Sequence, residues 1–107
     1  MSRLDAERFA DILAAIDRCE KYEQYLRSEE LGSMAYDAVL RNLGDIGEAV
    51  RALPPEVRGA MPDVPWASIA GLRNIVIHEY FRVNPDLILD IVDNQLGPLA
   101  QRLRLSS

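Results

Sequence analysis

The sequence predicts an all-α protein, an up-and-down bundle of four helices. Apolar residues recur at steps of three and four along most of the 107 residues, and no segment shows the strict alternation that is typical of a strand. Prolines and glycines divide this pattern into stretches of helical length. Successive amphipathic helices of this kind bury their apolar faces against one another, which favours a bundle.

The first predicted helix runs from about Asp5 to Ser28, before the break at Gly32. Its apolar face holds Phe9, Ile12, Leu13, Ile16, Cys19 and Leu26. The second predicted helix runs from about Ser33 to Leu53 and stops at two prolines, which lack the backbone N–H that a helix needs. Its apolar face holds Tyr36, Val39, Leu40, Leu43, Ile46, Gly47, Val50 and Leu53.

Residues 54–65 contain four prolines and are predicted to form a loop. A third helix is predicted from Pro65 to about Tyr80, because proline suits a first helical turn. Asn84 and Pro85 predict the start of a fourth helix, with asparagine as its N-cap and proline at its first helical position. The fourth helix has an apolar face of Leu87, Ile88, Ile91, Val92 and Leu96. Gly97-Pro98 is predicted to kink or end it, before a short helical tail at 99–105.

Length and composition predict a single domain over residues 1–107 with one hydrophobic core. No apolar run reaches the roughly 18 residues of a membrane span, and the first residues lack the apolar centre of a signal peptide. The lone Cys19 fits a reducing compartment, so we expect a cytoplasmic protein without membrane contact. One cysteine and one histidine disfavour a zinc site, and we expect no cofactor, although carboxylate-bound magnesium stays open.

The charge distribution limits how this chain can hold nucleic acid. The formal net charge is −5, which argues against general electrostatic attraction to a phosphate backbone. Residues 1–37 carry nine acidic and five basic residues, whereas residues 38–82 carry five of each. An RNA substrate would therefore be held locally. The acidic first helix is either a solvated face or a docking face for a basic partner.

The third predicted helix combines polar and apolar residues in an unusual way. At about 100° per residue, Arg73 falls in the middle of an apolar stripe. That stripe consists of Trp66, Ile69, Val76, Ile77 and Tyr80. A cation there needs a partner, because burial of an unpaired charge is costly. It can reach water along its own stem, face a second subunit or bind an anion.

Asn74 and His78 are four residues apart and share a helix face, so the asparagine can hydrogen-bond the imidazole and fix its tautomer. Arg73 lies roughly 140° from His78 around the helix, so the two would converge across a groove or between two copies of the helix in a dimer. Histidine transfers protons near neutral pH, and arginine matches phosphate oxygens. This chemistry suits metal-free cleavage of RNA, with a second histidine from a dimer, or water, as the other proton carrier.

Each of these residues also has an ordinary structural interpretation. A lone histidine is commonly a partly buried core residue, and a tyrosine near a helix end commonly packs with its hydroxyl in water. We interpret Trp66 as a core residue that anchors the third helix, and Asn42 and Glu48 as structural residues that hydrogen-bond between helices. The joint pattern, rather than any one residue, points to a functional site.

Arg73, Asn74, His78 and Tyr80 match the signature of the HEPN superfamily: an arginine, a polar residue, three further positions, a histidine, any residue and a tyrosine. The surrounding sequence resembles the HepT-like branch of that superfamily over roughly residues 5–103. The segments that carry this resemblance are Arg41-Asn42-Leu43, Ile46-Gly47-Glu48-Ala49, Leu53-Pro54-Pro55, Pro65-Trp66, Ile69-Ala70-Gly71-Leu72 and His78-Glu79-Tyr80-Phe81.

The resemblance implies a HEPN-like homodimer whose two motifs meet at the interface and cut RNA without metal, with tRNA the leading target. Arg73 and His78 would be catalytic and Asn74 supporting. It also implies a toxin of a type VII-like toxin–antitoxin system. Its antitoxin would be a minimal nucleotidyltransferase that transfers AMP from ATP to Tyr80. The alternative, from a different functional class, is a catalytically silent helical module that binds such a nucleotidyltransferase.

Overall fold

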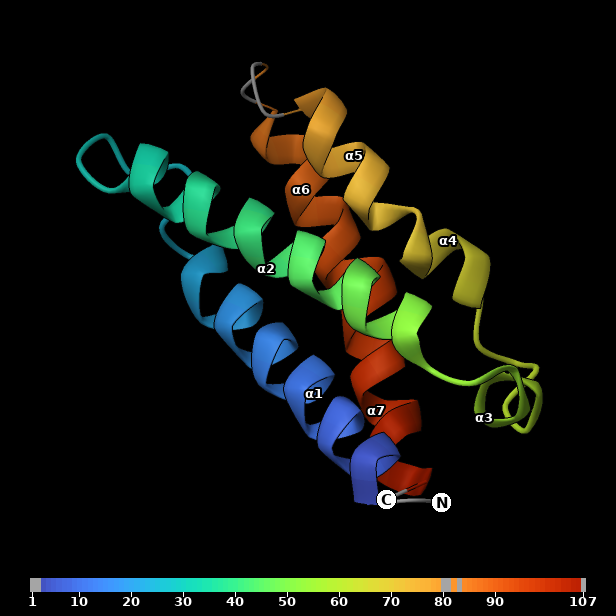
Figure 1. Cartoon of the computed structure of the whole chain (residues 1–107). Coiled ribbons are helices and arrows are strands. Elements are labelled where there is room, and N and C mark those ends of the chain that lie inside the picture. Colours follow the sequence, from blue (N-terminus) through green and yellow to red (C-terminus); the bar gives the residue numbers. More distant parts are fainter. Residues whose placement is uncertain (1–2, 80–81, 83, 107) are drawn as a thin grey trace.

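The computed structural model describes residues 3–79, 82 and 84–106, and those residues form helices and connections without a strand (Figure 1). Helix α1 (Arg3–Glu23) packs against α2 (Gly32–Ala52). The chain then returns through α3 (Pro55–Gly59), α4 (Trp66–Ala70) and α5 (Leu72–Glu79). It ends with α6 (Pro85–Ile91), the π-helical segment η1 (Val92–Leu96) and α7 (Gly97–Ser106). The first turn of α1 and the last turn of α7 lie at the same end of the bundle. The predicted all-α bundle is confirmed.

Helix α2 occupies the centre of the bundle, in contact with α1, α4, α5 and α6. Every residue that the sequence assigned to its apolar face is buried. The predicted face of α1 is also buried, except that Leu13 is partly exposed. The two faces meet because each presents one continuous apolar stripe, and removal of that area from water stabilises the pair at about 25 cal/mol per Å².

Helix α1 ends five residues earlier than predicted. Beyond Glu23 the chain continues as turns in which Leu26 and Ser28 donate to carbonyls three residues back, at 3.2 and 3.0 Å. These tighter turns still bury Leu26. Arg27 forms an ion pair with Asp86 in the first turn of α6. The sequence placed the helix end too late because Leu26, which is buried in a turn, continues the apolar spacing of α1.

Residues 54–65 contain a short helix, α3, where the sequence predicted only a loop. Pro55 stands in its first turn, where the missing N–H costs nothing. The buried Trp66 holds this segment to α4, because its indole nitrogen donates to the carbonyls of Arg58 and Met61, both at 3.0 Å. The interpretation of Trp66 as a core anchor is confirmed.

The predicted third helix, Pro65 to Tyr80, is divided into α4 and α5 at Gly71. The Gly71 amide donates to the Ala67 carbonyl at 3.0 Å, and the Asn74 amide donates to the Gly71 carbonyl at 3.0 Å. The second bond spans only three residues and tightens the chain there. The regular α-helical hydrogen bonding is therefore interrupted between α4 and α5. Tyr80 itself lies outside the described residues.

The fourth helix begins as predicted, with the Asn84 side chain accepting from the Leu87 amide at 3.2 Å. Gly97-Pro98 does not end it. The winding widens to π-helix over residues 92–96 and then returns to α-helix in α7. The residues predicted as a short tail, 99–105, are part of α7. Pro98 has no N–H to offer the carbonyl four residues back, and a wider turn before the proline makes room for its ring. Among the described residues no helix is both long and apolar enough to cross a membrane.

Candidate functional site

Helix α5 exposes the residues of the sequence motif. Of its eight residues only Leu72 is buried, while Arg73, Asn74, Ile77 and His78 are exposed. Asn74 and His78 are both open to solvent, as their four-residue spacing allows. Within the described part of the chain, no hydrogen bond joins their side chains, so the predicted tautomer-fixing contact is not formed here.

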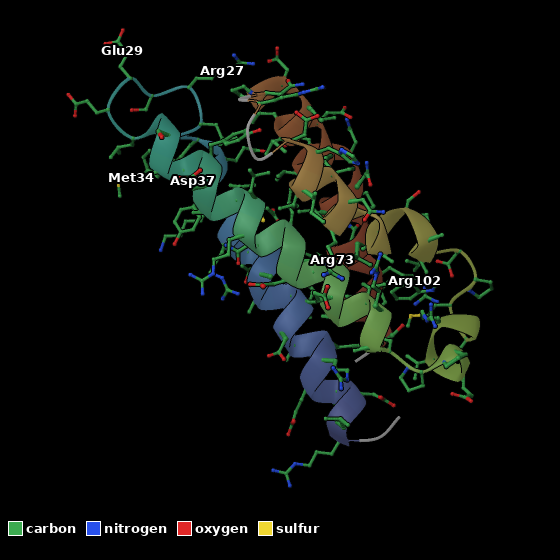
Figure 2. The ribbon with its side chains drawn as sticks, turned by 45° about the horizontal axis from the view of Figure 1, so that its top comes forward. Arg27, Glu29, Met34, Asp37, Arg73 and Arg102 are labelled. Atoms are coloured by element: carbon green, nitrogen blue, oxygen red, sulfur yellow. The ribbon has the colours of Figure 1, made fainter. Side chains whose placement is uncertain are left out.

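In the single chain Arg73 is not buried, and it has a charged partner. Its side chain is half exposed, and its Nε lies 2.9 Å from Oε1 of Glu48 on α2. Figure 2 shows the Arg73 guanidinium beside α2. Trp66 and Ile69 belong to α4 and are buried, whereas Arg73 belongs to the exposed helix α5. Ile77, which the wheel placed on the same stripe, is 60% exposed.

Helix α2 positions the start of α5 through Gly47. A Cβ at Gly47 would lie 3.1 Å from the amide nitrogen of Arg73 and 3.2 Å from the carbonyl oxygen of Ala70. Such distances are tighter than most Cβ contacts, so a side chain at position 47 would require α5 to shift by a few tenths of an ångström. The backbone of Arg73 is thereby fixed against α2.

Helix α2 positions the end of α5 through Tyr36. The Tyr36 hydroxyl lies 3.2 Å from the carbonyl oxygen of Glu79 and 2.7 Å from that of Arg82, and it accepts from the Asn84 amide at 3.2 Å. A hydroxyl has one hydrogen and two lone pairs, so it serves one carbonyl at a time while it accepts from the amide. This buried side chain ties the exit of α5 and the cap of α6 to the centre of the bundle.

The structural interpretation of Asn42 is confirmed. Its Oδ1 accepts from Arg18 Nε of α1 at 2.7 Å, and its Nδ2 donates to the Ala38 carbonyl at 2.7 Å. Glu48 also joins two helices, but its partner is the motif arginine. The sequence analysis missed this pairing. The available signal was a small residue followed by an acid, Gly47-Glu48, on a helix that packs against the motif.

A buried thiol and a partly buried carboxyl group lie outside this site. Burial raises the pKa of the Cys19 thiol to about 12, so the thiol stays protonated inside the core. Burial, followed by the hydrogen bond and charge of Asp93, raises the pKa of Glu23 to about 7. One carboxyl oxygen of Glu23 is buried without a hydrogen-bond partner.

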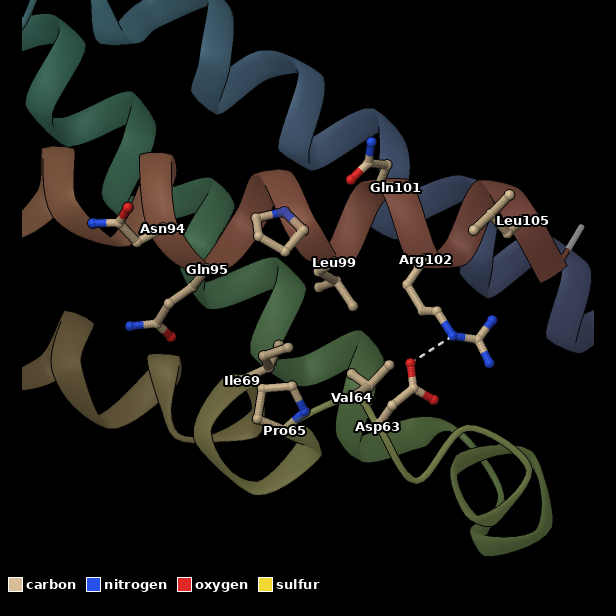
Figure 3. A pocket seen from close by; sticks show the side chains of 11 residues that line it. Asp63, Val64, Pro65, Ile69, Asn94, Gln95, Leu99, Gln101, Arg102 and Leu105 are labelled. Carbon is tan, nitrogen blue, oxygen red and sulfur yellow. Dashed lines mark hydrogen bonds and ion pairs between the residues drawn. The ribbon is translucent and has the colours of Figure 1, made fainter.

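A groove of about 330 Å³ separates the segment 63–69 from η1 and α7 (Figure 3). Arg102 Nε lies 2.7 Å from Asp63 across it, and this hydrogen bond lowers the pKa of Asp63. None of the described motif residues lines this groove. Among the described residues no three His, Cys, Asp or Glu side chains gather closely enough to hold a metal ion.

The chain matches the model of one protein family, described as Ribonuclease HepT-like, over residues 12–105. It is 32% identical over 108 residues to "Putative RNase MJ1380" of Methanocaldococcus jannaschii, covering 98% of this chain and 99% of the relative. It is 29% identical to "Probable ribonuclease HepT" of Thermococcus cleftensis, covering 92% of each chain.

Some relatives are longer than this chain. "Putative RNase MJ0127" of Methanocaldococcus jannaschii is 39% identical over 75 residues, which cover 70% of this chain and 59% of the relative. "Putative RNase TTE0752" of Caldanaerobacter subterraneus is 42% identical, and the match covers 63% of this chain and 60% of the relative. No solved structure matches the chain. Because the family model covers almost the whole bundle and includes the Arg73–His78 segment, the chain belongs to the HepT-like ribonuclease family of the HEPN superfamily.

Proposed function

We propose that this chain is an endoribonuclease whose catalytic side chains are Arg73 and His78, with Asn74 in support. The observation that carries the proposal is that α5 presents this arginine and this histidine together at the surface of a HepT-like ribonuclease. The acidic balance of the chain fits a site that engages a few phosphates locally rather than a long backbone.

The proposed reaction is an internal transfer at phosphorus. The 2′-hydroxyl loses its proton and forms a bond to the adjacent phosphorus, while the bond from phosphorus to the 5′-oxygen breaks and that oxygen gains a proton. The products are a 2′,3′-cyclic phosphate and a 5′-hydroxyl end. His78 carries one of the two protons, and the Arg73 guanidinium stabilises the negative charge on the phosphate oxygens.

A homodimer would supply the second proton carrier. The chain has one histidine, and both halves of the reaction need a proton transfer. Ile77 stands beside His78 with an apolar side chain that is 60% exposed, which suits burial against a second copy of α5. We expect Ile77→Asp to convert the dimer into a folded monomer with little activity. Light scattering and circular dichroism would measure both effects, and an Ile77→Asp protein that stays dimeric would contradict this interface.

Purified protein on total tRNA, with EDTA present, tests the catalytic assignment. We expect cleavage to persist in EDTA and to fall by about 10²- to 10⁴-fold in His78→Ala and Arg73→Ala. Arg51→Ala, which removes an exposed arginine from α2, is the matched control and should cleave like the wild type. If wild type and His78→Ala leave the RNA equally intact, the chain is instead the silent interaction module.

We further propose that the chain is the toxin of a type VII-like toxin–antitoxin pair. Its antitoxin would be a minimal nucleotidyltransferase that uses ATP, and Tyr80 would accept the AMP. What supports this is the motif position of Tyr80, two residues after His78 in a HepT-like chain. A bulky anion two residues from the proposed proton carrier would repel RNA phosphates and obstruct the site.

Mass spectrometry after incubation with the partner and ATP tests the acceptor. We expect one added AMP on Tyr80 and a matching loss of RNA cleavage. Tyr80→Phe should remain unmodified, and Tyr25→Phe, which changes an exposed tyrosine elsewhere, should be modified normally. Equal modification of the Tyr80→Phe protein would rule out Tyr80 as the acceptor.

A further inference from the structure

We propose that Glu48 is a positioning residue for the reaction, because its carboxylate orients the Arg73 guanidinium toward the scissile phosphate. This inference rests on the proposed function, in which Arg73 stabilises charge on that phosphate. Glu48 stands on α2, outside the motif segment, and its contact with Arg73 joins two helices.

The contact with Glu48 leaves the two outer nitrogens of the Arg73 guanidinium free for a phosphate. Glu48 Oε1 accepts from Nε, at the root of the guanidinium, over 2.9 Å. Arginine carries five N–H donors in a rigid planar fork. A bond at Nε fixes the rotation of the whole plane and leaves donors at the outer nitrogens for a two-point contact with phosphate oxygens.

Two neighbouring residues of α2 act on the same arginine. Gly47 lets the α2 backbone contact the Arg73 amide, which fixes where the side chain starts. Glu48 then fixes where the side chain ends. A long, half-exposed arginine otherwise samples many rotamers, and a misplaced catalytic group can cost as much as about 10²-fold in rate.

Fold stability does not account for this pair. Both side chains are about half exposed, at 50% for Arg73 and 56% for Glu48. Exposed ion pairs contribute little to the free energy of folding, because water and salt screen the attraction. The carboxylate also opposes RNA binding, since its negative charge lies beside the proposed phosphate contact. Loss of the hydrogen-bond acceptor should therefore lower kcat, whereas loss of the charge alone should lower KM.

Kinetics of Glu48→Ala and Glu48→Gln separate these two effects. Glu48→Ala loses the acceptor and should lower kcat by about 10-fold or more. Glu48→Gln keeps an amide oxygen that accepts from Nε but loses the charge, so kcat should stay within about 3-fold of wild type while KM falls. Asp37→Asn is the matched control, because it removes one exposed negative charge from α2 at the end away from Arg73 (Figure 2), and its kcat should not change.

A second readout does not depend on activity. The ¹⁵N–H signal of Arg73 Nε, assigned by its loss in Arg73→Lys, should exchange with water faster in Glu48→Ala than in wild type or Glu48→Gln. The thermal unfolding midpoints of all three should agree within a few degrees. An unchanged kcat in Glu48→Ala, an equal loss of kcat in both Glu48 variants, or unchanged exchange would each overturn the proposal. If wild-type protein does not cut RNA, the proposed function fails, while the exchange data still decide whether Glu48 holds the guanidinium.

Discussion

Helices α2 and α5 pack against each other but serve the molecule in opposite ways. On α2, Leu43, Ile46 and Val50 are all at 0% exposure, and the helix contacts four neighbouring helices. On α5 only Leu72 is buried, and the motif side chains face outward. Helix α2 therefore contributes much more to the buried core than α5 does. Helix α5 is a short exposed element held in place by α2. Substitutions in the centre of α2 should therefore lower stability, whereas substitutions on the exposed face of α5 should leave the stability of the single chain almost unchanged.

The largest effect on stability is expected at the centre of α2. Leu43→Ala removes a fully buried side chain and leaves a cavity among residues of α1, α2 and their neighbours. We expect a loss of about 2–5 kcal/mol in the free energy of unfolding. Urea denaturation followed by circular dichroism would measure it, and the loss should not depend on protein concentration.

Ile77→Ala on α5 is the matched change on an exposed helix. In dilute protein it should alter the free energy of unfolding by less than about 0.5 kcal/mol. At concentrations where the proposed dimer forms, it should lower stability because it weakens the association. If Ile77→Ala costs as much as Leu43→Ala at every concentration, α5 carries part of the core and the contrast between the helices is wrong.

An intermediate effect is expected where the two helices touch. Gly47→Ala places a methyl group 3.1 Å from the Arg73 amide and 3.2 Å from the Ala70 carbonyl, so α5 must move outward. We expect a loss of about 1–3 kcal/mol in stability and a lower kcat, because Arg73 moves with its backbone. Thermal unfolding and the tRNA assay would measure the two effects.

Gly44→Ala provides the control on the same helix. A Cβ at Gly44 meets nothing within 4 Å. Alanine is favoured over glycine in a helix interior by up to about 1 kcal/mol, so this variant should be slightly more stable than wild type and equally active. Equal destabilisation by both substitutions would show that close approach of α5 is not the reason for glycine at Gly47.

Most of the fold could be predicted from the sequence because the apolar spacing on α1 and α2 reflects burial on a single face. The start of α6 could also be predicted, since Asn84 and Pro85 both determine the first turn of that helix through local contacts. Besides the early end of α1 and the short helix α3, two features of the later helices were not predicted. The break at Gly71 includes a three-residue hydrogen bond, from the Asn74 amide to the Gly71 carbonyl, and it leaves the apolar period almost intact. The π-helical segment before Pro98 depends on a local change in winding.

The candidate site was only half predictable, for a related reason. The motif spacing identified Arg73 and His78 as residues of one helix, but the partner of Arg73 lies 25 positions earlier on α2. A helical wheel describes one element and contains no information on contacts between elements. The wheel also placed Arg73 on an apolar stripe, but it could not show that this stripe is buried at Ile69 on α4 and exposed at Ile77 on α5.

The smallest predicted effect concerns Glu23 at the end of α1, and it depends on pH. The folded chain holds this carboxyl at a pKa of about 7, above its ordinary value of 4.5, because of burial and then Asp93. The folded state therefore binds this proton more tightly than the unfolded state. The stabilisation is complete below about pH 4.5 and is lost as pH rises through about 7.

Glu23→Gln keeps the neutral form at every pH, and we expect it to raise the unfolding temperature slightly at pH 8 but hardly at all at pH 4.5. Calorimetry at both values would measure the difference. Glu29→Gln, an exposed change in the turn after α1 (Figure 2), should show no such pH dependence. Equal effects of the two substitutions would mean that overall charge, rather than the contact between Glu23 and Asp93, sets the stability of this end of the bundle. A gain confined to Glu23→Gln would place the pH-sensitive contact between α1 and the π-helical segment, away from α5.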